Sequence, residues 1–164
     1  MADVRETRQT PMPEWVAAWL ALHDLPTEEV PMWAAWWLVE GFDGPHLRLL
    51  AGLPGDDPFE VKAVLPDALA EMGVEVPDAS AATRVVFEGL AARCLSGRLS
   101  EREVAQAVWR VYVDRDYASE VWDEPLGVVG AMDDEWDAGW GRGDRQLRQA
   151  VRKACEAQLR RGDD

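Results

Sequence analysis

The 164-residue sequence is poor in cysteine, lysine and histidine, with only two residues of each. Its cysteines, Cys94 and Cys155, lie far apart, without C-x-x-C spacing and without a histidine beside them. This pattern argues against a zinc site and against a disulfide framework. We therefore expect both cysteines to be small buried hydrophobic residues in a protein of a reducing compartment.

Long apolar runs are also missing, and none approaches the roughly 20 residues that a helix needs to span a bilayer. The first residues, MADVRETRQTPMP, are polar and lack the apolar region of a signal peptide. We expect a cytoplasmic protein in which residues 1–12 form a mobile N-terminal tail.

No signature of a familiar catalytic site occurs in the sequence. It has no G-x-S-x-G, no phosphate-binding P-loop, no dinucleotide fingerprint and no cysteine paired with histidine as a nucleophile. Enzymatic activity is therefore left open, and no cofactor is expected under the leading hypothesis.

Negative charge is abundant, since 31 Asp and Glu face 17 Lys and Arg for a net charge of −14. Such a chain repels nucleic acids and anionic membranes and attracts basic proteins through the same Coulomb interaction. Direct binding of nucleic acid is disfavoured, and a basic protein partner is favoured. The alternative is that the acidity only keeps the protein in solution.

Helix signals recur along the chain, and no alternating β pattern is present. Proline stands at predicted helix starts (Pro13, Pro45, Pro58), and Ser100 with Glu103 forms a capping box. Pro66 is expected to break or kink the helix that begins at Pro58. The sequence predicts an all-α fold, a single domain over residues 13–161, built as an irregular or orthogonal bundle of about seven or eight short helices.

Nine tryptophans are unusual for this length. The first five lie on short apolar helices and are expected to fill the core: Trp15, Trp19, Trp33, Trp36 and Trp37. The helix over residues 31–41 is apolar all round and is expected to be buried on most sides. Trp109 lies off the apolar stripe of its helix, so it either packs under a loop or is an exposed anchor for a partner.

The segment 114–137 concentrates nine acidic residues against one base, Arg115. Within it, Asp133, Asp134 and Asp137 have the spacing D-D-x-x-D, which resembles the element that binds magnesium–diphosphate in terpene synthases. The resemblance covers five residues of a chain too short for that fold, and no second metal motif is present, so the activity is not carried over. Glu120 and Asp123 likewise match only half of the carboxylate pattern of helical nucleotide pyrophosphohydrolases.

Two functions remain open from these residues. The first is a non-enzymatic acidic helical protein that binds a basic partner, as an immunity protein or antitoxin does. Its charged rim and its aromatic anchors would be Trp122, Asp123, Glu124, Asp133, Asp134, Glu135, Trp136, Asp137 and Trp140.

The alternative is a small Mg²⁺-dependent enzyme acting on a phosphorylated or nucleotide substrate. It would use Asp133, Asp134 and Asp137 as metal ligands, with Glu120 or Asp123.

Basic residues of the predicted last helix could compete with a partner for the acidic segment. Arg145, Arg148 and Arg152 fall on one face of the predicted last helix and could neutralise the acidic segment within the chain. The sequence does not indicate the oligomeric state.

Overall fold

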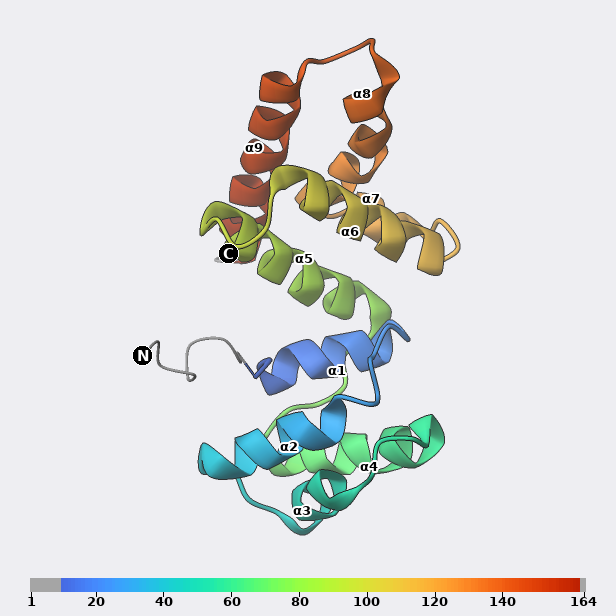
Figure 1. Ribbon diagram of the computed structural model, residues 1–164, viewed down its shortest axis with the longest axis vertical. Coiled ribbons are helices and arrows are strands. Elements are labelled where there is room, and N and C mark those ends of the chain that lie inside the picture. Colours follow the sequence, from blue (N-terminus) through green and yellow to red (C-terminus); the bar gives the residue numbers. More distant parts are fainter. Residues whose placement is uncertain (1–9, 163–164) are drawn as a thin grey trace, which may run out of the picture. The chain divides into compact units, whose positions relative to one another are not determined.

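The computed structural model describes residues 10–162, and every regular element within that range is helical (Figure 1). The prediction of an all-α fold is confirmed. The elements are α1 (Pro13–Ala21), α2 (Val30–Val39), α3 (Pro45–Gly52), α4 (Pro58–Glu71), α5 (Ala79–Leu95), α6 (Glu101–Asp114), α7 (Ser119–Trp122), the 3-10 helix η1 (Pro125–Met132), α8 (Asp133–Ala138) and α9 (Asp144–Gly162). None of these described helices is long and apolar enough to cross a membrane.

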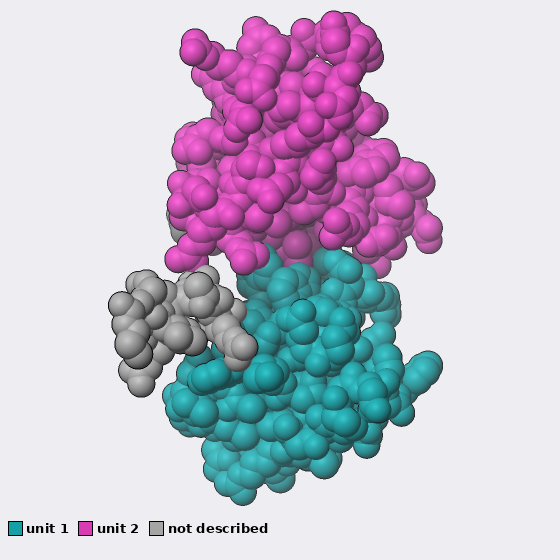
Figure 2. Space-filling view, in the orientation of Figure 1, with its two compact units in different colours: residues 1–78 teal, residues 79–164 magenta. Residues whose placement is uncertain are grey.

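The chain forms two compact units, unit 1 over residues 1–78 and unit 2 over residues 79–164 (Figure 2). The single domain expected over residues 13–161 stays a prediction. Most of the predicted N-terminal tail, residues 1–9, lies outside the described residues.

Unit 1 is built from α1 to α4, with α3 packed against both α2 and α4. Proline occupies the first turn of each of these helices, where a missing amide proton costs no helical hydrogen bond. Leucine side chains from α3 and α4 fill the core around Trp37, whose indole donates a hydrogen bond to the carbonyl of Pro11 at 3.0 Å.

The five N-terminal tryptophans do not all lie in that core. Only Trp37 is fully buried, while Trp15, Trp19 and Trp33 stack in a half-buried row with ring centroids 5.1 and 5.8 Å apart. Trp36 is exposed. The expectation that all five fill the core is therefore met in full only by Trp37.

Pro66 does not interrupt its helix, because α4 runs without a break from Pro58 to Glu71. Proline removes one helical hydrogen bond, but Pro66 itself is exposed, and Val61 and Leu65 before it are buried, as are Ala68 and Leu69 after it. Burial of apolar residues on both sides of the proline holds the two halves in one helix. The predicted break was wrong, and the kink that was the other expectation stays a prediction.

Unit 2 packs α5 against α9, and η1 against both α6 and α9. The capping box at the start of α6 is confirmed, with the Glu103 amide donating to Ser100 Oγ and the Ser100 amide to the Glu103 carboxylate. Cys94 on α5 and Cys155 on α9 are buried free thiols that lie close enough to shift each other's pKa. Their predicted burial is confirmed, although nothing in their spacing indicated that they adjoin.

Residues 125–138 form two consecutive short helices. A 3-10 helix, η1, is followed directly by the short α8. A Cβ atom on Gly127 would overlap the carbonyl oxygen of Val121, and one on Gly130 would lie 3.2 Å from the amide nitrogen of Trp109. The glycines that weaken a helix in this segment thus allow η1 to approach the backbones of α6 and α7 closely.

Candidate functional site

Arg102, in the first turn of α6, holds the carboxylates of α8. Its Nε atom donates to Asp133 at 3.1 Å, and its Nη1 atom donates to Asp137 at 3.2 Å. Gln106, one turn further along α6, also donates to Asp133. The hydrogen bond with Arg102 lowers the pKa of Asp137 below its ordinary value. Two carboxylates of the D-D-x-x-D element are therefore paired with a cation from another helix.

The same contacts engage two of the three predicted magnesium ligands, Asp133 and Asp137. The guanidinium of Arg102 lies where a metal ion shared by Asp133 and Asp137 would be needed, and Asp134 has no ion pair among the described residues. Glu120, the additional ligand considered, pairs with Arg115, which lowers its pKa. Within residues 10–162 no three His, Cys, Asp or Glu side chains are grouped so that they could hold a metal ion.

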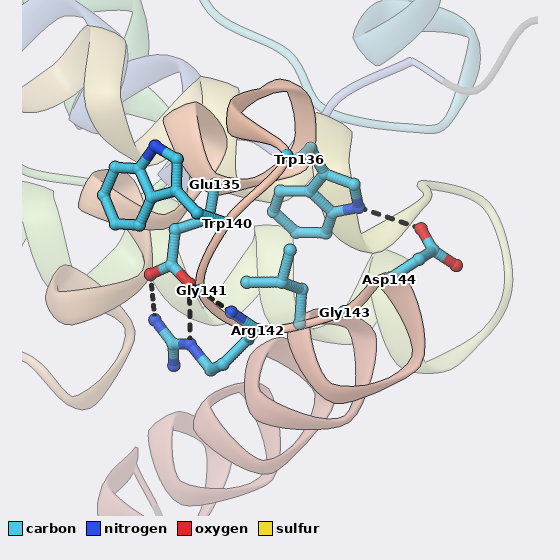
Figure 3. Close-up of a pocket in the computed structure, with 9 residues that line it drawn as sticks. Glu135, Trp136, Trp140, Gly141, Arg142, Gly143 and Asp144 are labelled. Carbon is cyan, nitrogen blue, oxygen red and sulfur yellow. Dashed lines mark hydrogen bonds and ion pairs between the residues drawn. The ribbon is translucent and has the colours of Figure 1, made fainter.

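Glu135 and Trp136 lie in an open pocket of about 300 Å³ between α8 and the start of α9 (Figure 3). Glu135 accepts hydrogen bonds from the Nε atom of Arg142 at 3.0 Å and from its amide at 3.2 Å, and this pairing lowers its pKa. The indole of Trp136 donates to Asp144 Oδ1 at 3.0 Å. Trp140, also on the pocket wall, is largely exposed.

The charged side chains labelled in Figure 3 are hydrogen-bonded within this pocket, Glu135 to Arg142 and Asp144 to the indole of Trp136. A ligand would have to break the Glu135–Arg142 pair before it could use either group. The pocket therefore offers aromatic surface from Trp136 and Trp140 but no unsatisfied charge pair, and it does not by itself indicate a substrate.

Glu124 is not part of an exposed rim, because its side chain is only 2% exposed. It accepts a hydrogen bond from Gln158 at 2.7 Å and pairs with Arg84 at 3.2 Å. Burial of a carboxylate is costly unless hydrogen bonds and an opposite charge compensate it, and α5 and α9 supply both. The structure thus removes Glu124 from the predicted partner surface, whereas its neighbour Asp123 is exposed.

Two of the three arginines expected to neutralise the acidic segment have other partners, and Arg145 has no ion pair among the described residues. Arg148 pairs with Asp144 and with Glu101, and Arg152 pairs with Glu101. At the end of α9, Arg161 reaches the Asp123 carbonyl and, at 4.0 Å, Glu124. The basic face of α9 therefore does not cover the exposed aspartates of the segment.

Four aromatic rings form a continuous cluster where α6 leads into α7. Tyr112 contacts Tyr117 and Trp122 edge-on with centroids 4.8 and 4.9 Å apart, and Trp109 stacks beside Tyr112 at 5.6 Å. Trp109, Tyr117 and Trp122 are between 41% and 58% exposed. Aromatic rings that hold one another in place while half of their surface remains accessible are typical anchors for a partner.

The cluster continues onto an exposed strip of α6, which we call the α6 face. Arg102, Gln106, Trp109 and Val113 are spaced i, i+4, i+7 and i+11 and therefore share one side of the helix. The α6 face joins the carboxylates held by Arg102 at one end to the aromatic cluster at the other.

Three aspartates lie next to the cluster in sequence: Asp114, Asp116 and Asp123. All three side chains are exposed, and none has an ion pair within the described part of the chain. Of the bases in the same region, Arg115 is engaged by Glu120 and Arg110 is exposed. The aromatic end of the α6 face thus carries more unpaired negative than positive charge.

Sequence reasoning included Trp122 and Asp123 but missed Tyr112 and Tyr117. In the sequence pattern Tyr112 falls on the apolar stripe of the helix that Ser100 caps, which favours a core position, and no clear pattern surrounds Tyr117. A left-handed backbone at Asp116 (φ 49°) and Tyr117 (φ 61°) turns the chain back so that Tyr117 meets Tyr112. Neither residue is glycine, so no sequence signal marked this turn.

The negative charge is divided unequally between the two units. Unit 1 has fifteen Asp and Glu against four Lys and Arg, a net charge of −11, whereas unit 2 has sixteen against thirteen, a net charge of −3. The acidic residues of unit 2 are thus largely balanced in number by bases of the same unit, and the larger excess of carboxylates lies in unit 1.

Comparison with known proteins returned no match: no family model, no curated protein and no solved structure is similar to this chain.

Proposed function

We propose that the protein binds a basic protein partner through the α6 face and the aromatic cluster, without catalysing a reaction. The observation that carries the proposal is a cluster of four aromatic rings in edge-on and tilted contact, three of them half-exposed, together with three exposed aspartates that have no ion pair among the described residues.

Arginine and lysine side chains suit such a surface in two ways. Their cationic groups are attracted to the faces of tryptophan and tyrosine rings, and carboxylates beside the rings accept their hydrogen bonds. The partner would contact Trp109, Tyr117 and Trp122 with its apolar and cationic groups and meet Asp116 and Asp123 at the edge. Predicted rim residues Asp134 and Asp137 extend the same surface towards α8.

The most concrete form of this function is an inhibitor of the immunity or antitoxin type, which masks a cationic protein. Charge complementarity of this kind speeds association and makes it sensitive to salt. A cytoplasmic location, where unlinked thiols such as Cys94 and Cys155 persist, belongs to the same proposal.

The proposal is tested by capture from native lysate of the source cells, using the full chain as bait at about 50 and 500 mM salt. We expect a basic protein to be retained at the lower salt and largely released at the higher. Trp122→Ala and Asp123→Asn should each weaken its retention by about tenfold, as loss of an interface anchor does.

Two matched variants serve as controls. Phe59→Ala removes an exposed aromatic ring from unit 1, and Glu156→Gln removes an exposed negative charge from α9. Both should retain the partner as the wild type does. Loss of binding in these variants, retention that does not depend on salt, or an acidic captured protein would contradict the proposal.

A further inference from the structure

Helix α2 of unit 1 has an exposed apolar strip. The sequence pattern, which is apolar on all sides, predicted instead that most sides of this helix are buried. Val30, Ala34 and Trp37 point into the core of unit 1. Met32, Trp36 and Val39, spaced i, i+4 and i+7, share a different side of the helix, and all three are exposed. Val39 is the most accessible of them, at 75%.

Acidic residues stand at both ends of this strip. Glu28 and Glu29 precede α2, and Glu40 follows its last residue. All three are exposed and have no ion pair with any described residue. Along a helix axis, Glu29 and Glu40 are separated by about 16 Å, or three turns.

The charge at the end of α2 is unfavourable by itself. The carbonyl groups at the C-terminus of a helix carry partial negative charge, which a nearby cation stabilises and a carboxylate opposes. Helix α2 has no basic residue in its last turn and has Glu40 at its C-cap. A positive charge from outside the chain would therefore be bound by both Glu40 and the helix end.

We infer that this strip of α2 binds an amphipathic helix of a protein partner, with apolar residues over Met32, Trp36 and Val39 and basic residues at both ends. The net charge of −11 on unit 1 favours a basic occupant of this strip, because opposite charges attract. A second copy of the chain, with a net charge of −14, would be repelled from the strip, and so would an anionic membrane surface. The site is on unit 1 and does not depend on the α6 face.

The test uses two synthetic 16-residue peptides of leucine, lysine and glutamine. In the first, the leucines lie on one helical face and the lysines in the first and last turns; in the second, the same residues are scrambled. Titration calorimetry with the full chain should give at least about tenfold tighter binding for the amphipathic peptide, because only it covers the strip.

Substitutions then locate the site. Val39→Ser and Met32→Ser should weaken binding of the amphipathic peptide by about fivefold each, whereas Phe59→Ser, which changes an 86% exposed residue on α4, should leave it unchanged. Glu40→Gln should weaken binding and reduce its salt dependence, whereas Glu75→Gln, also exposed in unit 1, should have a smaller effect on both.

Three results would overturn the inference: equal affinity for the two peptides, equal effects of Val39→Ser and Phe59→Ser, or self-association of the chain that Val39→Ser abolishes. Trp122→Ala should bind the peptide like the wild type. This variant distinguishes the α2 strip from the α6 face, since failure of one site leaves the result at the other unaffected.

Discussion

Gln158 of α9 donates a hydrogen bond to the carboxylate of Glu124 at 2.7 Å, and both side chains are buried. The same glutamine accepts a hydrogen bond from the amide of Leu126 at 3.0 Å through its carbonyl oxygen. One side chain therefore satisfies both a buried carboxylate and a backbone amide at the start of η1. This contact fixes the segment that carries the predicted acidic residues onto α9.

Replacement of Gln158 by leucine should destabilise the fold strongly. The variant keeps a similar volume but leaves the Glu124 carboxylate and the Leu126 amide without this partner in a buried site. We expect the free energy of unfolding to fall by about 2–4 kcal/mol, measured by urea denaturation. Gln149→Leu, an exposed change on the same helix, should alter it by less than about 0.5 kcal/mol.

Gly127→Ala tests the close approach of η1 to α7. The added methyl group would overlap the carbonyl oxygen of Val121, so one of the two backbones must shift. We expect a loss of at least about 2 kcal/mol in thermal or urea unfolding. Gly143→Ala, whose Cβ would meet no atom within 4 Å, should have little effect, and equal losses in both variants would refute the packing described here.

Acid should destabilise unit 1 partly through Glu71. Burial alone would raise the pKa of this carboxyl, but hydrogen bonds from the amides of His46 and Leu47 and from the His46 ring lower it below its ordinary value. A carboxyl with a lowered pKa in the folded state stabilises the fold above its unfolded pKa, near 4, and loses this contribution as the pH falls through the folded value.

Glu71→Gln should therefore be less stable than the wild type at pH 7 and should approach it as the pH is lowered from about 5 to 3. Urea denaturation at each pH measures this difference. Glu75→Gln, an exposed neighbour, provides the control and should follow the wild-type curve. A constant difference between Glu71→Gln and the wild type across this range would contradict the assigned contacts.

Alkali should destabilise unit 2 through Cys155. Burial of its thiol raises the pKa to about 12, compared with about 9 in an unfolded chain. A group whose pKa is raised on folding gives its full stabilisation below the unfolded pKa and loses it as the pH rises through the folded pKa. The decline between pH 9 and 12 should reach on the order of 1–3 kcal/mol.

Cys155→Ala should lower stability at pH 7 by leaving a small cavity, but its alkaline decline should be shallower than that of the wild type. Tyrosine and lysine titrate in the same pH range, but they are present in both proteins. The difference between the two stability curves therefore gives the contribution of the Cys155 thiol alone. Parallel curves for both proteins would show that Cys155 is accessible to solvent, contrary to its burial.

Local signals were the part of the fold that the sequence predicted well. Proline at Pro13, Pro45 and Pro58 and the Ser100–Glu103 capping box act within one helical turn, so their effect does not depend on tertiary packing. Pro66 shows the limit of such signals, because buried residues on both sides of it sustain a helix that its local chemistry disfavours.

The candidate site depended on contacts between distant residues. Arg102 is 31 and 35 residues away from the aspartates it binds, and Glu124 is buried because α5 and α9 bring Arg84 and Gln158 to it. No pattern within the acidic segment reveals these partners. The sequence contains the difference in net charge between residues 1–78 and 79–164. That difference could not be calculated until the structure placed the boundary between the two units at residue 78.

The most direct test of the proposed partner surface is a map of backbone amide chemical shifts in the full chain, with and without the basic protein captured from lysate. If the α6 face binds it, the largest changes should fall on residues 109–123, with smaller ones on residues 133–137, and Trp122→Ala should require about tenfold more partner to produce them. Changes confined to α9, with residues 109–123 unaffected, would contradict the account.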